Sequence, residues 1–156
     1  MTNIYEKILD ILGKNKDDPS FINFVSELCE KPDIVIDDKQ ACVFLFRQSG
    51  IQLIYFYHCQ CFASAYFRLG NKNDRMQPYK GDLPFKIQFD DSVTDVEQKI
   101  NIKPISSKLI RGCNSEEPKD HYVEYSLNLY VLNFIFGGST QKLSSFSISY
   151  DPAFKF

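Results

Sequence analysis

Apolar residues near the start of the chain recur every three or four positions, and this spacing predicts two amphipathic helices. The first helix is expected over residues 4–12, with Asn3 as its N-cap and Gly13 as its end. The second is expected over residues 19–29, where Asp18 is the cap and Pro19 occupies a first position that needs no backbone N–H. Residues 1–30 are therefore predicted to be helical.

From residue 34 onward the pattern changes to the two-residue alternation and short apolar runs that are typical of β-strands. Turn-forming residues at Ser49-Gly50 and at 137–140 separate these runs and favour hairpins. Residues 34–156 are therefore predicted to be mostly β, with candidate strands at 34–36, 42–46, 51–57, 62–69, 105–110, 121–126, 127–136 and 142–150.

One short helix interrupts the β pattern near residues 93–100. Ser92 is a good N-cap, and Asp95 occupies the acidic position of a capping box three residues later. Asn101 tolerates the left-handed conformation that ends a helix, and Pro104 cannot prolong it. The segment is predicted to be a turn, a short strand and a capped helix.

These elements predict an α+β fold in a single domain, residues 1–156. The expected architecture is an antiparallel β-sheet meander, with the N-terminal helices and the short central helix covering one face. A weak internal similarity between residues 52–69 and 126–149 indicates two unequal halves, each a helical segment followed by a meander. The uncovered face of the sheet is then available to a partner.

The central segment carries a recognisable motif. Tyr79 to Pro84 reads Y-x-G-x-L-P, a short strand follows, and Asp91 to Ile100 reads D-S-x-x-D-V-x-x-K-I. Over roughly residues 50–150 this pattern resembles small bacterial immunity proteins of contact-dependent growth-inhibition and polymorphic toxin systems, although Asn101 stands where Gly is usual. The resemblance implies a protein that binds a partner toxin. A similar pattern occurs in β-lactamase-inhibitor-like repeats, so the motif indicates a fold more firmly than a function.

Charge and composition narrow the function classes. The net charge of −2 and the pI of about 5.7 argue against direct binding of nucleic acid, which favours basic surfaces. The apolar runs are too short for a membrane span. Five cysteines are an odd number, and the N-terminal residues lack the basic and apolar pattern of a secretion signal. A reduced, cytoplasmic protein is expected.

Three groups of residues are candidate reactive sites. His58, Cys59 and Cys61 are soft zinc ligands, but the second pair of ligands is missing and a hairpin tip is the simpler interpretation. Cys113 with His121, oriented by Glu124, has no surrounding catalytic signature. Carboxylates at Asp90, Asp91, Asp95 and Glu97 are explained more simply by the helix N-terminus than by acid–base or metal chemistry. No catalytic residue, metal or cofactor is predicted.

Binding residues are expected among exposed tyrosines and acidic loops. Tyr55, Tyr57, Tyr66 and Tyr79 are large, stiff side chains with one polar end, and Tyr79 is the favoured anchor because it precedes the turn. Acidic pairs in loops are suited to a basic partner. The candidate toxin-binding residues are Tyr79, Asp90, Asp91, Glu116, Glu117, Asp37 and Asp38.

The leading hypothesis is a non-enzymatic immunity protein that neutralises a cognate toxin domain, of the nuclease type, by stoichiometric binding. The chain is expected to act as a monomer or in a one-to-one complex. Two alternatives remain open: a small α+β ligand-binding or scaffolding domain unrelated to toxins, and an enzyme that uses the cluster around Asp90 and Asp91.

Overall fold

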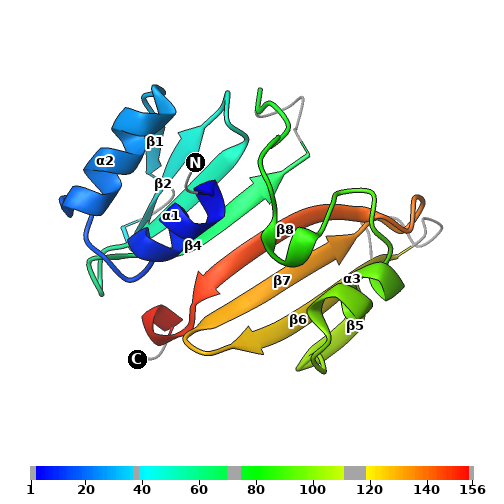
Figure 1. Ribbon diagram of the computed structural model, residues 1–156. Coiled ribbons are helices and arrows are strands. Elements are labelled where there is room, and N and C mark those ends of the chain that lie inside the picture. The colour runs from blue at the N-terminus through cyan, green and yellow to red at the C-terminus, as the bar shows by residue number, and fades with distance from the viewer. Residues whose placement is uncertain (1–2, 37–38, 70–74, 111–118, 155–156) are drawn as a thin grey trace.

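The computed structural model describes residues 3–36, 39–69, 75–110 and 119–154. Within these ranges it is an α+β fold with one eight-stranded antiparallel sheet, whose strand order is β1-β2-β3-β4-β8-β7-β6-β5 (Figure 1). The helices are α1 (Ile4–Ile11), α2 (Pro19–Leu28) and α3 (Val93–Ile100), with short 3-10 turns η1 (Pro84–Lys86) and η2 (Asp151–Phe154). The strands are β1 (Asp33–Ile36), β2 (Ala41–Phe46), β3 (Ile51–Phe56), β4 (Cys61–Arg68), β5 (Ser106–Ile110), β6 (Asp120–Leu127), β7 (Tyr130–Phe136) and β8 (Leu143–Tyr150).

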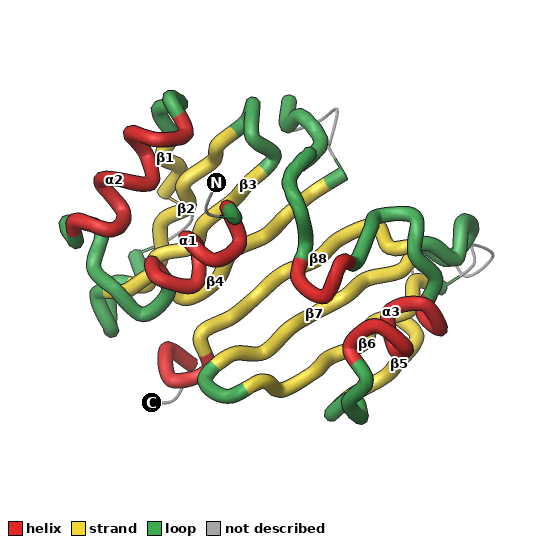
Figure 2. The backbone as a smooth tube through the Cα atoms, viewed as in Figure 1, coloured by secondary structure: helices red, strands yellow, loops and turns green. Residues whose placement is uncertain are grey.

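The sheet consists of two four-stranded meanders, β1–β4 and β5–β8, that join edge to edge through an antiparallel pair between β4 and β8. In this pair Tyr66 lies opposite Ser147. Helices α1 and α2 lie over the first meander and α3 lies over the second, on the same side of the sheet (Figures 1 and 2). Within the described ranges the opposite side, called here the uncovered face, carries no α-helix, and only the short turn η2 packs against it, beside Phe56.

The hydrophobic core lies between the helices and the sheet, and strand register shows that it is continuous across both meanders. In an antiparallel sheet, residues that are partners across strands point to the same face. Each side chain in the resulting row is at most 1% exposed. The row runs Phe46, Ile51, Phe67, Phe146, Phe134, Val123.

The helix ends follow from their capping residues. Asn3 Oδ1 accepts a hydrogen bond from the Tyr5 N–H at 3.0 Å, and Asp18 Oδ1 accepts one from the Ser20 N–H at 2.9 Å. Ser92 and Asp95 form the predicted capping box, and Asn101 ends α3 in the left-handed conformation, with a φ of 56°. No helix in the described ranges is long and apolar enough to cross a membrane.

The segment from Tyr79 to Asp91 connects the two meanders on the helical side of the sheet (Figure 2). The Tyr79 N–H donates to the Arg68 carbonyl at 2.7 Å, and the Asp91 carbonyl accepts from the Leu143 N–H at 2.8 Å. Gly50, with a φ of +70°, leaves room for this connection, because a Cβ there would lie 2.4 Å from the Tyr79 nitrogen. The central motif therefore ties the first meander to the second.

Candidate functional site

The uncovered face presents a row of polar side chains across the middle of the sheet. The row is built by register, since each member lies opposite the next on the neighbouring strand. Ser147 at its centre is only 6% exposed, and the tyrosine, asparagine and glutamate of the row are half-buried. The row runs Gln52, Tyr66, Ser147, Asn133, Glu124, Ser106.

Tyr122 adds a second aromatic side chain beside this row. Its hydroxyl lies 2.6 Å from Glu124 Oε2 and 2.5 Å from Asn133 Oδ1, and the Lys108 ammonium lies over its ring, 5.2 Å from the centroid. Burial, the hydrogen bond to Glu124 and the nearby charges of Glu124 and Tyr66 hold the pKa of the Tyr122 hydroxyl well above its usual range. The phenol therefore stays protonated and keeps Glu124 in a fixed position.

Apolar side chains flank the polar row on the same face. Val43 and Ile54 are partners on neighbouring strands, and Val131 lies opposite Ser126 on the other half of the sheet. Near the β3–β4 hairpin tip, Phe56 packs edge-on against Phe154 of η2, with ring centroids 5.3 Å apart. The face thus combines half-buried aromatic and amide groups with an apolar surround, as the centres of protein interfaces do.

Tyr79, the favoured anchor, is buried rather than exposed, so that expectation is wrong. It is 5% exposed, its ring packs edge-on against Phe67 at 4.9 Å, and its hydroxyl donates to the Asp82 carbonyl at 3.1 Å. Burial, together with the charge of Asp82, raises the pKa of Tyr79 to about 12. A Cβ on Gly81 would lie 2.2 Å from this hydroxyl, which explains the Y-x-G spacing of the motif. Tyr55 is buried as well, at 2% exposure.

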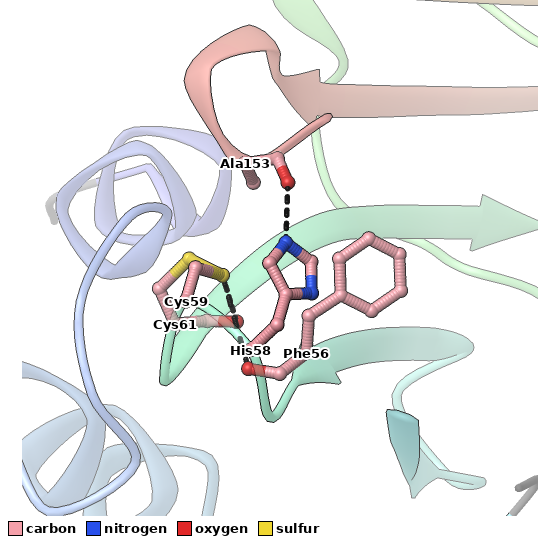
Figure 3. Close-up of a disulfide and its surroundings, with 5 residues drawn as sticks. All are labelled: Phe56, His58, Cys59, Cys61 and Ala153. Carbon is pink, nitrogen blue, oxygen red and sulfur yellow. Dashed lines mark hydrogen bonds between the residues drawn. A yellow bond between two sulfur atoms is a disulfide. The ribbon is translucent and has the colours of Figure 1, made fainter. Parts of the chain in front are cut away.

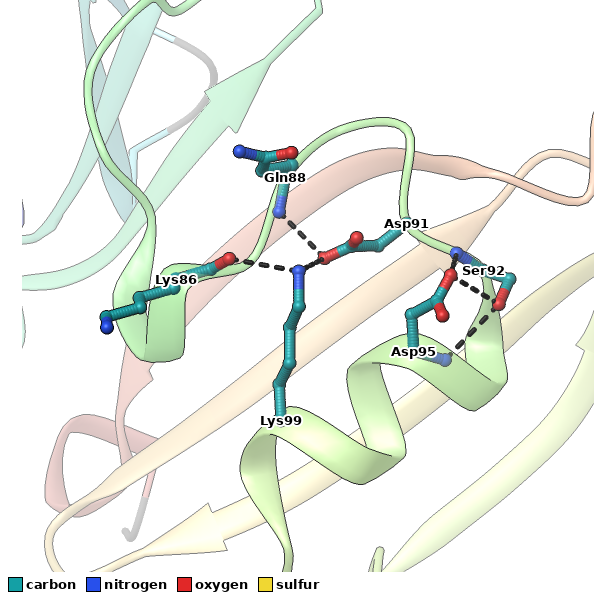
Figure 4. A network of polar contacts seen from close by, with 6 residues as sticks. All are labelled: Lys86, Gln88, Asp91, Ser92, Asp95 and Lys99. Carbon is teal, nitrogen blue, oxygen red and sulfur yellow. Dashed lines mark hydrogen bonds and ion pairs between the residues drawn. The ribbon is translucent and has the colours of Figure 1, made fainter.

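Asp91 serves the fold, whereas its neighbour Asp90 is exposed. Asp91 Oδ2 accepts hydrogen bonds from the Gln88 N–H at 2.9 Å and from the Lys99 ammonium at 2.6 Å (Figure 4). Lys99 also donates to the Lys86 carbonyl at 3.0 Å. The two aspartates therefore do not form a shared carboxylate site, and the interpretation of Asp91 as a toxin contact is replaced by a structural role.

Replacing Asp91 with asparagine is expected to lower the free energy of unfolding by roughly 1–2 kcal/mol, because the Lys99 ammonium loses its buried carboxylate partner. Asp90→Asn is the matched control, since the exposed Asp90 should change stability by less than about 0.5 kcal/mol. Urea denaturation of both variants measures the difference. Equal stability of the two variants would contradict the role given to Asp91.

The H-C-x-C segment is a hairpin tip with a disulfide (Figure 3). Cys59 and Cys61 are bonded, with their Cα atoms 5.3 Å apart, so the expectation of reduced thiols is wrong for this pair. His58 Nε2 lies 3.0 Å from the Ala153 carbonyl and joins the tip to η2. In the described part of the chain, no three His, Cys, Asp or Glu side chains gather closely enough to hold a metal ion.

Several other predicted positions lie outside the described residues. These are Asp37, Asp38, Glu116, Glu117 and Cys113. Of the proposed Cys–His pair, His121 is described, and its Nε2 lies 2.7 Å from Ser107 Oγ. His121 and Glu124 are three residues apart on β6 and point to opposite faces of the sheet, so Glu124 does not orient this imidazole.

A groove lies on the helical side, between α1 and the connecting segment Tyr79–Phe89. This groove has a volume of about 1010 Å³ and is lined by Tyr5 and Leu9 of α1, the connecting segment, and Leu127. Phe85 lines the groove, is 39% exposed and has a φ of 58°. The groove combines charged and apolar walls.

Tyr66 was among the tyrosines named as candidate anchors, but the cluster that it forms at the centre of the uncovered face was not predicted from the sequence. Tyr122 and Asn133 come from adjacent strands, and Tyr66 comes from the other meander. Their two-residue alternation with buried partners was visible in the sequence, but the pairing of β4 with β8 that aligns them was not. The side chains of this site are brought together by the register between strands that are far apart in the sequence.

Comparisons with known proteins bear on the fold. No protein-family model and no curated protein matches the chain. A solved structure of an extracellular protein containing a SCP domain from Bacillus anthracis str. Ames is similar, with a TM-score of 0.59 and 14% identity. The similarity covers 94% of this chain and 46% of that chain, so this chain spans about half of its length. At this identity the similarity shows the fold alone.

Proposed function

We propose that the chain is an immunity protein that binds a cognate toxin domain through the uncovered face of its sheet and neutralises it by occupying the toxin's working surface. The main support for this proposal is the uncovered face, where two half-buried tyrosines, an asparagine and a glutamate lie side by side on a rigid sheet. The motif between Tyr79 and Ile100, which resembles immunity proteins, adds independent support.

The uncovered face is broad, because its polar row crosses six of the eight strands of the sheet. A standard interface buries roughly 1,600 Å² in total, and its affinity comes mainly from a few aromatic and polar anchors near the centre. Tyr66 and Tyr122 are such anchors, and they lie near the middle of a row that spans six strands from Gln52 to Ser106. The Tyr122 side chain is already held by Glu124 and Asn133, so little of its conformational entropy is lost on binding.

Charge indicates the chemistry of the partner. Glu124 is the acidic member of the polar row, and the other members of the row are neutral. A cationic side chain of the toxin, of the kind that lines a nuclease cleft, would satisfy the free lone pairs of this carboxylate. The protein then acts stoichiometrically, without turnover, cofactor or contact with nucleic acid. The fold supplies a shaped surface.

Co-expression with the product of the adjacent reading frame tests the proposal. The expected result is a stoichiometric complex on size-exclusion chromatography and rescue of cells that express the toxin. Glu124→Lys should weaken this complex at least tenfold, or about 1.4 kcal/mol, because it places like charges together. Asp90→Lys, the same charge change at an exposed site away from the face, is the control. Absence of both complex and rescue would reject the proposal.

Small-ligand binding is a second candidate function, and the groove of about 1010 Å³ beside α1 favours it. A ligand there would contact Phe85 and the Tyr79–Phe89 segment instead of the uncovered face. The two functions therefore predict protection of different aromatic side chains in a bound state.

A further inference from the structure

The outer edge of the sheet at β5 is an exposed strand with apolar side chains. All of its residues from Ser107 to Ile110 are exposed, and Leu109 reaches 62%. Ile105, immediately before the strand, is 58% exposed, while its N–H donates to the Glu124 carbonyl at 2.8 Å, so it already runs alongside β6. Exposed edges of this kind are templates for pairing with another strand.

The charge that usually protects an edge strand is turned away here. Lys108 is the central residue of β5, and lysines on edge strands normally discourage pairing. Its ammonium instead lies over the Tyr122 ring of the neighbouring strand, at 5.2 Å. A strand added beyond β5 would therefore meet the backbone groups of β5 and the side chains of Ile105, Ser107 and Leu109.

We propose that β5 pairs antiparallel with β5 of a second copy of this chain, about a two-fold axis that passes through Ser107 perpendicular to the sheet. Residues that lie opposite each other on paired strands point to the same face of the sheet. When β5 pairs with its own copy about such an axis, one residue must therefore lie directly opposite the same residue of the other copy. With Ser107 on the axis, Ile105 of each copy lies opposite Leu109 of the other copy, so the pairing contains two such apolar pairs. Lys108 lies opposite Ser106.

The neighbouring registers are poorer. An axis through Lys108 places two ammonium groups directly opposite each other, which is destabilising. An axis through Leu109 shifts the pairing beyond residue 110, past the end of β5, and leaves Ile105 unpaired. The axis through Ser107 pairs four apolar side chains and separates the charges, so the strand is complementary to itself in this register.

The proposed dimer has a defined consequence. Ile105 and Leu109 lie on the helical side of the sheet, on the same face as Ser107, which contacts His121. Rotation about an axis perpendicular to the sheet does not exchange its two faces. The two copies therefore form one continuous sheet, and their uncovered faces point in the same direction. This inference does not rest on the proposed function, and it differs from the expectation of a monomer or a one-to-one complex.

Sedimentation equilibrium of the full chain tests the dimer. The expected result is a reversible dimer whose dissociation constant rises at least tenfold in Leu109→Lys, because each copy then places a charged side chain opposite the apolar Ile105 of the other copy. Ile34→Lys is the matched control, since Ile34 is also 62% exposed but lies on β1 at the opposite edge. A chain that remains monomeric, or a dimer weakened by Ile34→Lys and not by Leu109→Lys, would overturn the proposal.

Disulfide cross-linking tests the register separately. A cysteine at the axis faces its own copy within bonding distance, so Ser107→Cys should form a covalent dimer under mild oxidation, identified by mass spectrometry of the linked peptide. Lys108→Cys should not, because its partner in this register is Ser106. Efficient linkage through position 108 and none through position 107 would overturn the proposed axis.

Discussion

Replacing Tyr66 with alanine is expected to weaken binding of the cognate toxin by roughly 30-fold, equivalent to about 2 kcal/mol, with little loss of folding stability. The reason is the position of its ring at the centre of the uncovered face, opposite Ser147 and beside Gln52. Isothermal titration calorimetry measures the affinity, and thermal unfolding confirms that the variant is folded.

Phe85→Ala is the matched control for this loss of affinity. Phe85 is an aromatic residue with 39% exposure, but it lies at the groove on the helical side of the sheet. Its removal should leave toxin affinity within about threefold, since truncation away from an interface centre costs little. A large loss in Phe85→Ala together with an unchanged Tyr66→Ala would move the binding surface to the helical side.

Phe146→Ala is expected to lower the free energy of unfolding by about 3–5 kcal/mol, the largest stability effect predicted for a single substitution in this chain. Phe146 is fully buried on β8, where the two meanders join. Its ring centroid lies 5.4 Å from that of Phe67 on β4 and 5.0 Å from that of Phe134 on β7. Tyr5 of α1 packs on it at 6.3 Å. The cavity would therefore weaken both meanders at once.

Guanidinium denaturation measures this effect, and Phe154→Ala supplies the control. Phe154 is 45% exposed and contacts Phe56 at the edge of the uncovered face, so its truncation should cost less than about 1 kcal/mol. If the two meanders unfolded in separate transitions in Phe146→Ala, the aromatic contacts at the junction would be the link between them. A Phe146→Ala variant as stable as Phe154→Ala would contradict the account of the core.

The local elements could be predicted from the sequence because their signals are local. Capping residues Asn3, Asp18 and Ser92 placed the starts of the three helices, and Asn101 placed the end of the third. Two-residue alternation located the eight strands. These signals depend on neighbours within a few positions of the chain.

The candidate site could not be predicted in the same way, because it depends on contacts between distant residues. The burial of Tyr79 follows from its packing on Phe67, and the role of Asp91 follows from Lys99 in the next helix. Phe67 lies outside the motif, and although Lys99 is the lysine of the motif, the pattern does not show that it pairs with Asp91. The row from Gln52 to Glu124 requires the pairing of β4 with β8, which joins segments about eighty residues apart.

Hydroxyl-radical footprinting of the toxin complex tests the central claim most directly, since it reports the solvent access of individual aromatic side chains. The uncovered face predicts that Tyr66 and Tyr122 lose reactivity when the toxin binds, while Phe85 at the groove and the 40% exposed Tyr57 keep theirs. Protection of Phe85 with unchanged reactivity at Tyr66 and Tyr122 would contradict the account.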